Sequence, residues 1–290
     1  MNVTVAKTAG FCFGVKNAVE KVYETVEEAA LSGRKVYTYG PVIHNESVVN
    51  ELKERGAQII EDLDSLCAVG DGIVILRSHG VGKNVYKRLE EKGVDYRDVT
   101  CPFVKKIHGI VSQYERDGYE IVICGDALHP EVQGICGWCS PENTAVIMDT
   151  EQAREFVPKS EKDDAKLCVV AQTTFNINKF KEIVDILNEK GYYVNVLNTI
   201  CSATRERQEE TCELALKSDA MIVIGSANSS NTRKLFEISR KGCENTYYIQ
   251  TVQELNFSVL RNFKNVGITA GASTPNNIIE EVQTNVRNEF

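Results

Sequence analysis

Three cysteines, Cys12, Cys101 and Cys201, each stand between a short extended segment and a predicted amphipathic helix. The predicted strands cover 2–6, 94–99 and 192–197, and the helices that follow them cover 16–30, 103–115 and 204–217. A thiol at the start of a helix lies near the positive end of the helix dipole, which favours its thiolate form. One such cysteine would be a weak signal, whereas three in matching positions indicate a common function.

The distances from these cysteines to later polar residues repeat along the chain. His129 follows Cys101 by 28 positions, and Ser229 follows Cys201 by the same 28 positions. Each of these polar residues comes soon after a predicted strand. The equal spacing therefore indicates an internal repeat, with a period too long for a solenoid.

A second spacing supports the same repeat. Thr173 and Ser273 follow the second and third cysteines by 72 positions each. The first third of the chain is looser, because Cys12 precedes His44 by 32 positions and His79 by 67. We interpret the chain as three related α/β segments.

The alternation of strands and helices predicts mostly parallel sheets, whose ligands bind beyond the carboxyl ends of the strands. We expect three similar α/β domains, covering 14–100, 101–199 and 200–290, with the last completed by the N-terminal strand in 1–13. Arranged as a pseudo-threefold trefoil, they would direct the three cysteines and the polar strand ends into one central cavity.

Three thiolates without a fourth matching cysteine suggest two kinds of metal centre. Zinc usually takes closely spaced cysteine pairs, or cysteines with histidines. A [4Fe–4S] cluster tolerates wide spacing, and three protein thiolates leave one of its irons open. Such an iron is a Lewis acid that can bind a substrate oxygen and pass electrons to it. Unconnected core cysteines are the plain alternative, which the repeat makes less favoured.

The polar strand ends point to an anionic ligand. Three of the four histidines stand there. A single histidine in such a place is more often structural, but three in equivalent places argue for a shared anion or metal. A predicted helix begins after another strand with serine and asparagine, which suit either simple capping or phosphate oxygens. Together these groups indicate an anion of diphosphate size, and Glu131 is the acid placed to donate a proton beside it. The residues expected at the anion are His44, His79, His129, Ser229, Ser230, Asn231 and Ser273.

The remaining cysteines look unremarkable. Cys136 and Cys139 have the spacing of a thioredoxin-like dithiol, but the pair has no counterpart in the other thirds, and incidental thiols are the favoured interpretation. His108 lies inside a predicted helix and is expected to be structural. Five further cysteines occur in apolar or helical patterns and are expected to be small buried hydrophobic residues: Cys67, Cys124, Cys168, Cys212 and Cys243.

Composition restricts the class of protein. The chain has 290 residues, 42% of them hydrophobic and 26% charged, which is typical of a folded soluble protein of two or three domains. A net charge of −8 argues against a nucleic-acid groove. The N-terminal segment has the pattern of a strand rather than of a secretory signal, and no apolar run approaches the length of a membrane span. We therefore expect a cytoplasmic protein with no nucleic-acid or membrane partner.

Eight ordered segments, spread over nearly the whole chain, resemble one family. They are Gly-Phe-Cys-Phe-Gly-Val at 10–15, Pro-Val-Ile-His-Asn at 41–45, Ser-His-Gly-Val at 78–81, His-Pro-Glu-Val-Gln-Gly at 129–134, Gln-Thr-Thr at 172–174, Thr-Ile-Cys-Ser-Ala-Thr-Arg-Glu-Arg-Gln at 199–208, Asn-Ser-Ser-Asn at 228–231 and Thr-Ala-Gly-Ala-Ser at 269–273. The chain resembles the 4-hydroxy-3-methylbut-2-enyl diphosphate reductases, the IspH/LytB family. Ser202 stands where the family often has tyrosine, and the Cys136/Cys139 pair is outside its pattern.

The resemblance implies a trefoil of three α/β domains around an oxygen-sensitive [4Fe–4S] cluster and the last step of the non-mevalonate isoprenoid pathway. The substrate would lose its hydroxyl, with two electrons and two protons, to give isopentenyl and dimethylallyl diphosphates. Ferredoxin or flavodoxin would supply the electrons. The implied cluster ligands are Cys12, Cys101 and Cys201, and the implied diphosphate ligands are the seven residues listed above for the anion.

The same resemblance places three residues at the reacting end of the substrate. Thr173 and Glu131 would contact the hydroxymethyl group, with Glu131 heading a proton relay that His129 would share. Two other classes stay open from the residues alone. They are a non-catalytic iron–sulfur redox sensor and a zinc-dependent phosphate-ester hydrolase built from the same cysteines and histidines.

Overall fold

The computed structural model describes residues 1–160 and 165–289. Their strands form three four-stranded sheets, and every strand pair is parallel. Contacts between residues divide the chain into two compact bodies. Body 1 comprises Met1–Lys16, Ile43–Glu51 and Cys201–Phe290, and body 2 comprises Asn17–Val42 and Leu52–Ile200. The predicted fold class, α/β units with parallel sheets, is confirmed.

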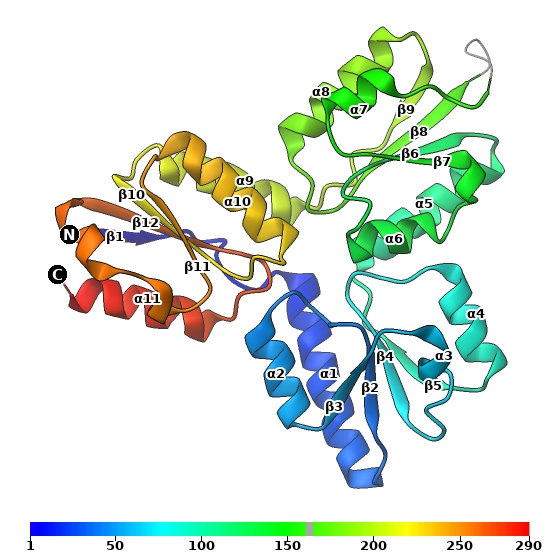
Figure 1. Cartoon of the computed structure of the whole chain (residues 1–290), viewed down its shortest axis with the longest axis horizontal. Helices are drawn as coiled ribbons and strands as arrows, with labels where there is room; N and C mark the ends of the chain where they lie inside the picture. Colours follow the sequence, from blue (N-terminus) through cyan, green and yellow to red (C-terminus); the bar gives the residue numbers. More distant parts are fainter. Residues whose placement is uncertain (161–164, 290) are drawn as a thin grey trace. The chain divides into compact units, whose positions relative to one another are not determined.

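Body 1 contains one sheet, of order β1-β12-β10-β11 (Figure 1). Its strands are β1 (Asn2–Val5), β10 (Ala220–Ile224), β11 (Thr246–Ile249) and β12 (Asn265–Ala270). Its helices are the start of α1 (Phe13–Ser32), most of α2 (Glu46–Glu54), α9 (Ser202–Ala215), α10 (Ser230–Gly242) and α11 (Asn276–Asn288), with the 3-10 turns η2 (Val252–Glu254) and η3 (Phe257–Asn262).

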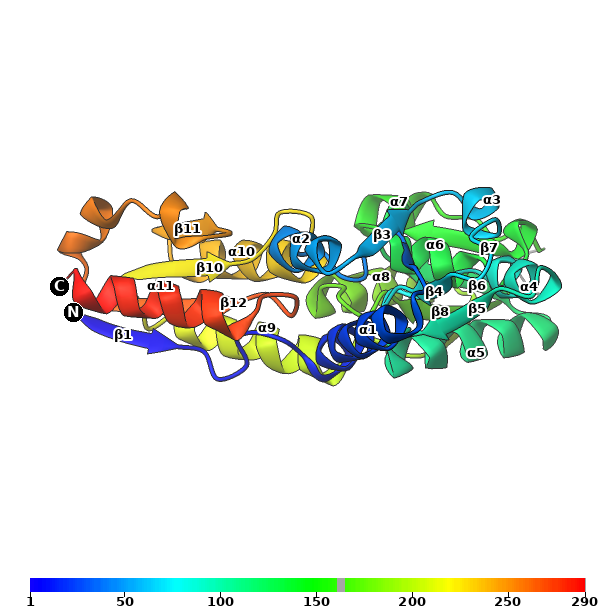
Figure 2. The same ribbon diagram turned by 90° about the horizontal axis from the view of Figure 1, so that it is seen from below.

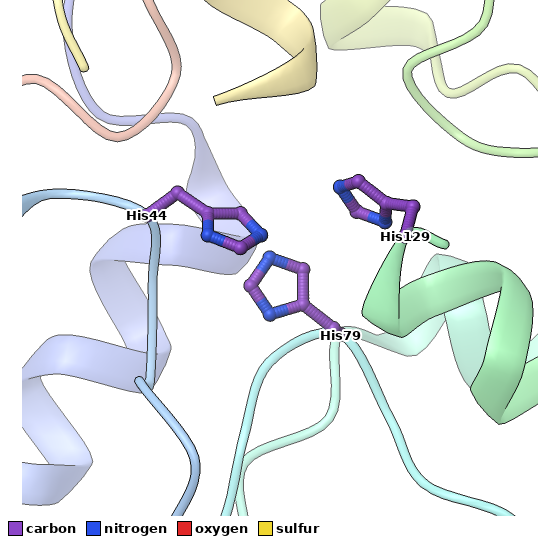
Figure 3. Close-up of side chains that lie close together, drawn as sticks. All are labelled: His44, His79 and His129. Carbon is purple, nitrogen blue, oxygen red and sulfur yellow. The ribbon is translucent and has the colours of Figure 1, made fainter. Parts of the chain in front are cut away.

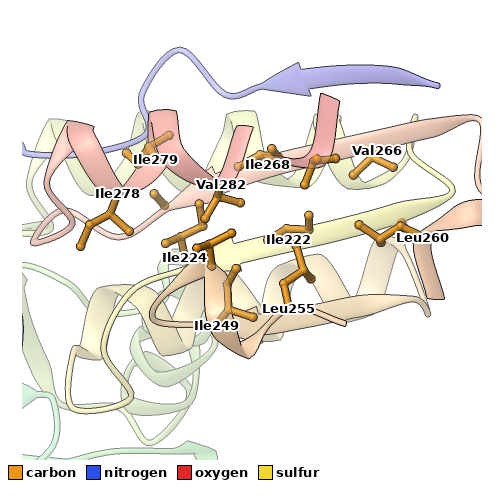
Figure 4. Close-up of a cluster of buried hydrophobic side chains, with 14 residues drawn as sticks. Ile222, Ile224, Ile249, Leu255, Leu260, Val266, Ile268, Ile278, Ile279 and Val282 are labelled. Carbon is orange, nitrogen blue, oxygen red and sulfur yellow. The ribbon is translucent and has the colours of Figure 1, made fainter. Parts of the chain in front are cut away.

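The core of body 1 lies between this sheet and the segments that cover it. Every residue of β10 is buried, as is typical of a central parallel strand covered on both faces. Figure 4 shows strand side chains such as Ile222 and Ile268 packing against Val282 of α11 and against Leu260 of η3. In Figure 2, α11, β1 and β12 run side by side. Burial of this apolar surface is the main stabilising contribution to the body.

Body 2 contains two sheets, of order β3-β2-β4-β5 and β7-β6-β8-β9. The strands of the first are β2 (Val36–Tyr39), β3 (Ala57–Ile60), β4 (Ile73–Leu76) and β5 (Asp95–Asp98). The strands of the second are β6 (Glu120–Cys124), β7 (Thr144–Ile147), β8 (Lys166–Ala171) and β9 (Tyr193–Val196). The helical segments are the rest of α1 and α2, then α3 (Leu63–Leu66), α4 (Lys83–Glu91), α5 (Pro102–Arg116), α6 (Pro130–Cys136), η1 (Pro141–Asn143), α7 (Thr150–Glu155) and α8 (Ile177–Glu189).

All three sheets have the same topology. In each, the first strand lies between the second and the third, and the fourth strand pairs with the third. In body 1 the fourth position is filled by β1, whose Val3 pairs with Val266 of β12. The expectation that the N-terminal strand joins the last sheet is thus confirmed. The predicted cysteines follow the strands at this fourth position, since β1, β5 and β9 precede Cys12, Cys101 and Cys201.

Several element boundaries differ from the expectation. The helices after the three cysteines begin at Phe13, Pro102 and Ser202, directly behind the thiols and up to three residues earlier than expected. The edge strands β7 and β11 and the helix α11 had not been assigned. The limits of the three expected domains stay a prediction. Residues 161–164 of the second expected domain and Phe290 of the third lie outside the described residues.

The expected burial of the other cysteines is mostly correct. Cys124, Cys168 and Cys243 are buried, and Cys67 is half-buried. The expectation is wrong for Cys212, which is exposed. The buried face of α9 carries Thr204, Arg207, Gln208, Thr211 and Ala215, so the helical period directs position 212 outward.

Among the residues that the structure describes, no helix combines the length and the apolar character needed to cross a bilayer.

Candidate functional site

Cys101 occupies the N-cap of α5, a helix of 15 residues. Its backbone N–H donates to the carbonyl of Ser78 at 3.0 Å, so the thiol is held beside the loop that follows β4. The thiol is half-buried. It lies where the unpaired N–H groups of a helix start create positive potential.

Cys201 and Cys12 occupy the corresponding positions in body 1. Cys201 is the N-cap of α9, and its Sγ accepts a hydrogen bond from the Thr204 N–H at 3.3 Å. Cys12 lies immediately before α1, and its N–H donates to the carbonyl of Ala272 at 3.3 Å. Both thiols are half-buried. The structure therefore places all three predicted cysteines at the same kind of strand-to-helix junction.

Glu131 is a buried acid in the first turn of α6, with only 3% of its surface exposed. Its two carboxyl oxygens accept hydrogen bonds from Thr173, at 2.6 Å from the backbone N–H and at 2.7 Å from the hydroxyl. Burial raises the pKa of Glu131 to about 7, against the opposing effect of these two bonds. A carboxyl with this pKa carries a proton for a large part of the time near neutral pH and can donate it.

His129 is the N-cap of α6 and is 6% exposed. Its Nδ1 accepts a hydrogen bond from the Glu131 backbone N–H at 3.1 Å. The neutral ring must then carry its proton on Nε2, which makes that atom a donor toward an anion. In the same body, the His79 and His129 rings meet edge to face, with centroids 5.5 Å apart (Figure 3).

The loop that carries His79 packs backbone to backbone against α6. A Cβ on Gly137 would lie 2.5 Å from the Cα of Gly82, and a Cβ on Gly134 would lie 3.1 Å from the Gly80 carbonyl oxygen. The indole N–H of Trp138 donates to the Val81 carbonyl at 2.9 Å. These contacts fix the helix start that holds His129 and Glu131 relative to His79.

In body 1, the expected anion ligands gather at the start of α10. Ser229 is the N-cap, and its Oγ accepts from the Thr232 N–H at 3.3 Å. Asn231 is 3% exposed, yet neither atom of its side-chain amide has a hydrogen-bond partner among the described residues. Buried amides are almost always paired, so this one has capacity for a ligand.

Ser273 and His44 belong to neighbouring segments of the same body. The Ser273 hydroxyl donates to the His44 backbone carbonyl at 3.0 Å. The Ser273 loop follows β12 directly, and His44 lies two residues before the start of α2. The residues expected at the anion are therefore divided between the two bodies. Body 1 holds His44, Ser229, Ser230, Asn231 and Ser273, and body 2 holds His79 and His129 together with Glu131 and Thr173.

Comparison with known proteins decides the family. The family model described as "LytB protein" matches residues 3–287. The chain belongs to the LytB family.

Curated relatives agree over the full length of the chain. A protein from Alkaliphilus oremlandii named 4-hydroxy-3-methylbut-2-enyl diphosphate reductase is 45% identical, over 99% of this chain and 100% of its own. A protein of the same name from Clostridioides difficile is 46% identical, again over 99% of this chain and 100% of its own.

Solved structures support the fold. The reductase structure from Plasmodium falciparum has a TM-score of 0.88 at 30% identity and covers 99% of this chain and 87% of that one. A second structure is titled as (E)-4-hydroxy-3-methyl-but-2-enyl diphosphate reductase, the terminal enzyme of the non-mevalonate pathway. It has a TM-score of 0.69 at 40% identity and covers 99% of this chain and 100% of that one. The family resemblance predicted from the sequence is confirmed.

Two charged residues of this LytB protein were missed by the sequence analysis. Glu46, at the start of α2, accepts hydrogen bonds from Ser226 at 3.0 Å, from Asn228 at 2.9 Å and from Gln250 at 2.6 Å. It thereby ties the His44 segment to the loop before Ser229. In the sequence, Glu46 has only the pattern of a first-turn acid, so nothing identified these long-range partners.

The second is Arg207, on the buried face of α9. Its guanidinium donates to the carbonyls of Ala270 at 2.7 Å and Gly10 at 2.9 Å. An arginine inside a helix carries no sequence signal of burial, because arginine is usually exposed.

The Cys136/Cys139 pair has the properties of structural thiols in this LytB protein. Cys136 is the last residue of α6, and Cys139 lies beyond the helix. Burial raises the pKa of Cys136, and it raises the pKa of Cys139 to about 12. A reactive dithiol needs an accessible thiolate, which these values disfavour. His108 stacks on Trp138, which lies between the two cysteines in the sequence, with ring centroids 5.0 Å apart.

Proposed function

We propose that this protein is a 4-hydroxy-3-methylbut-2-enyl diphosphate reductase. The reaction cleaves the C–O bond of the substrate's hydroxyl, which leaves as water. Two electrons come from an external donor, two protons are taken up, and isopentenyl and dimethylallyl diphosphates form. The full-length similarity to proteins of that name supports the assignment, and the observation that carries it is the buried, readily protonated Glu131 bonded to Thr173.

The proposed cofactor is a [4Fe–4S] cluster held by Cys12, Cys101 and Cys201. The donor set fits, because three half-buried thiols occupy equivalent junctions after equivalent strands. The buried Arg207, whose Nε has no partner among the described residues, also fits an anionic group beside Cys12 and Cys201. When bound, such a cluster supplies electrons and one open, Lewis-acidic iron.

The proposed role of the strand-end groups is to bind the substrate's diphosphate. Imidazole donors, serine hydroxyls, an unpaired asparagine amide and the start of α10 all favour phosphate oxygens. Anchoring the diphosphate would fix the orientation of the other end of the substrate. The residues assigned to this role are His44, His79, His129, Ser229, Ser230, Asn231 and Ser273.

Proton delivery is assigned to Glu131. Its carboxyl would donate toward the departing hydroxyl, and Thr173 would orient that carboxyl through its two hydrogen bonds. The Nδ1 of His129 accepts a hydrogen bond from the Glu131 backbone N–H, so His129 would share the relay through its Nε2. Burial around Glu131 excludes water, which keeps the proton transfer directed.

The proposed setting is the cytoplasm, with ferredoxin or flavodoxin as electron donor and with no nucleic-acid or membrane partner. These parts of the proposal follow from the family and from the acidic composition.

The first test is anaerobic purification followed by an absorption spectrum and an iron and sulfide assay, with and without the hydroxy-diphosphate substrate. We expect a brown protein with about four irons per chain, whose spectrum changes when the substrate is added. A coloured protein whose spectrum does not change when the substrate is added would favour the non-catalytic iron–sulfur sensor.

A colourless protein that cannot be reconstituted would contradict the reductase proposal, and stoichiometric zinc would favour the hydrolase. The hydrogen bond accepted by His129 Nδ1 already disfavours zinc at that residue, because the neutral ring then has its proton, not a lone pair, on Nε2.

A further inference from the structure

Arg207 is a buried cation that fits the proposed cluster site but has no step in the proposed reaction. The residue is 3% exposed and lies on α9, the helix that begins directly after Cys201. Its two terminal nitrogens bond to the carbonyls of Gly10 and Ala270. Gly10 precedes Cys12 by two residues. The guanidinium thus joins the segments that carry two of the three proposed cluster ligands, all within body 1.

The positive charge of Arg207 is not balanced by a carboxylate. No ion pair forms with it among the described residues, and its Nε is buried without a hydrogen-bond partner. The nearby acid, Glu210, is engaged elsewhere, since its oxygens accept from the N–H groups of Lys7 and Thr8 and from the Thr8 hydroxyl. Two neutral carbonyls satisfy hydrogen bonds but do not neutralise a charge.

A buried and unbalanced charge is costly, and proteins rarely retain one without a counter-charge. Burial lowers the pKa of Arg207, and the negative charges that oppose this effect are those of Cys12, Cys201 and Glu210. A guanidinium nevertheless stays protonated in proteins. The two thiolates, with whatever they bind, are therefore the balancing charge that the surroundings offer.

We propose that Arg207 is the internal counter-cation of the Cys12 and Cys201 thiolates and of the anionic cluster they hold. This role rests on the proposed function. It makes two contributions: the planar fork holds the two cysteine segments together, and the fixed positive charge favours the reduced, more negative state of the cluster. Arg207 acts through the ligands and is a positioning residue.

Two substitutions of Arg207 separate the effect of its charge from the effect of its geometry. Arg207→Gln removes the charge, so the midpoint potential of the reconstituted protein should become more negative, and iron should pass to a chelator severalfold faster. Arg207→Lys keeps the charge but cannot donate to both carbonyls as a planar fork does, so it should retain a potential near that of the unsubstituted protein while losing iron faster.

The test compares these two variants with Arg205→Gln by anaerobic potentiometry and by chelator-monitored iron release. Arg205 lies on the exposed face of the same helix, so its substitution should change neither measurement. A potential and a release rate for Arg207→Gln equal to those of the unsubstituted protein would overturn the proposal.

If Arg207→Gln does not fold, Arg207→Lys decides alone, because a potential displaced strongly from that of the unsubstituted protein would show that charge is not the relevant property. If the unsubstituted protein takes up no iron under reconstitution, the reductase proposal fails and this role fails with it. If the unsubstituted protein is brown but Arg207→Gln changes neither the potential nor the rate of iron release, only the role of Arg207 is overturned.

Discussion

At the scale of single residues, the chemistry depends on one carboxyl placed where it keeps its proton. Glu131 loses solvent on burial, and Thr173 supplies hydrogen bonds that only partly compensate, so its pKa rises to about 7. An exposed glutamate would be ionised at that pH and would be a poor donor. The pair thus converts an ordinary side chain into a general acid suited to neutral pH.

Glu131→Gln should retain iron and substrate binding but lose turnover by about 10²- to 10⁴-fold, because the amide has no acidic proton. Turnover of the unsubstituted enzyme should decline as the pH rises above about 7, as Glu131 ionises. Steady-state rates and substrate-induced spectral changes measure both effects. The exposed Glu142→Gln is the matched control, and near-normal turnover of Glu131→Gln would remove Glu131 from the relay.

The same acid should make stability depend on pH. Because the pKa of Glu131 is raised in the folded state from 4.5 to about 7, its contribution is fully present below the unfolded value and is lost as the pH rises through the folded value. As the pH rises from about 5 to about 8, the free energy of unfolding of cluster-free Glu131→Gln should increase relative to that of the unsubstituted protein by on the order of 3 kcal/mol at most. Urea unfolding at both pH values measures this difference, and a constant difference would contradict the raised pKa.

At the scale of elements, glycines allow a loop and a helix to touch through their backbones. The loop after β4 carries His79, and α6 carries His129 and Glu131, so their mutual position depends on the contact of Gly82 with Gly137. A side chain at Gly137 would separate the elements, because its Cβ would lie 2.5 Å from the Cα of Gly82. The Trp138 hydrogen bond to Val81 holds the contact closed.

Gly137→Ala should therefore destabilise the protein by about 1–3 kcal/mol, because its Cβ would lie 2.5 Å from the backbone of Gly82. The separation of His79 from His129 should also raise the KM for substrate. Gly109→Ala in α5 is the control: its Cβ meets nothing within 4 Å, and alanine should stabilise that helix by about 0.5–1 kcal/mol. Equal unfolding midpoints for the two variants would show that the glycine contact is not needed.

At the scale of the whole molecule, one topology occurs three times. Each sheet places a cysteine after its fourth strand, and β1 supplies that strand for the sheet formed by the C-terminal residues. The repeat gives each third of the chain one thiol at the same junction. We propose that the three thirds contribute to one shared cluster.

A shared cluster predicts that loss of a single thiol affects the whole centre. Cys101→Ser should reduce iron and sulfide content sharply after anaerobic purification, although body 1 retains its two thiols. Cys212→Ser, which changes an exposed thiol, should leave both contents unchanged. Unchanged iron and sulfide in Cys101→Ser would contradict its assignment as a ligand.

The sequence by itself determined the α/β class, the internal repeat and the family. Hydrophobic strands and helical periodicity are local properties, so the strands predicted at 94–99 and 192–197 could be identified without knowing their partners. Equal spacings from Cys101 and Cys201 to later polar residues then predicted the repeat, and the repeat placed the N-terminal strand in the last sheet, where the structure pairs β1 with β12. Short edge strands such as β7 and β11 have too little periodic signal to be found in this way.

The tertiary structure alone decided which side chains are charged, paired or buried. The pKa of Glu131 depends on desolvation and on Thr173, which lies 42 residues away in the chain. The burial of Arg207 between Gly10 and Ala270, the exposure of Cys212 and the partners of Glu46 likewise depend on how helices lie against sheets. These properties come from neighbours distant in sequence, and a linear pattern of residue types carries no record of which neighbours will meet.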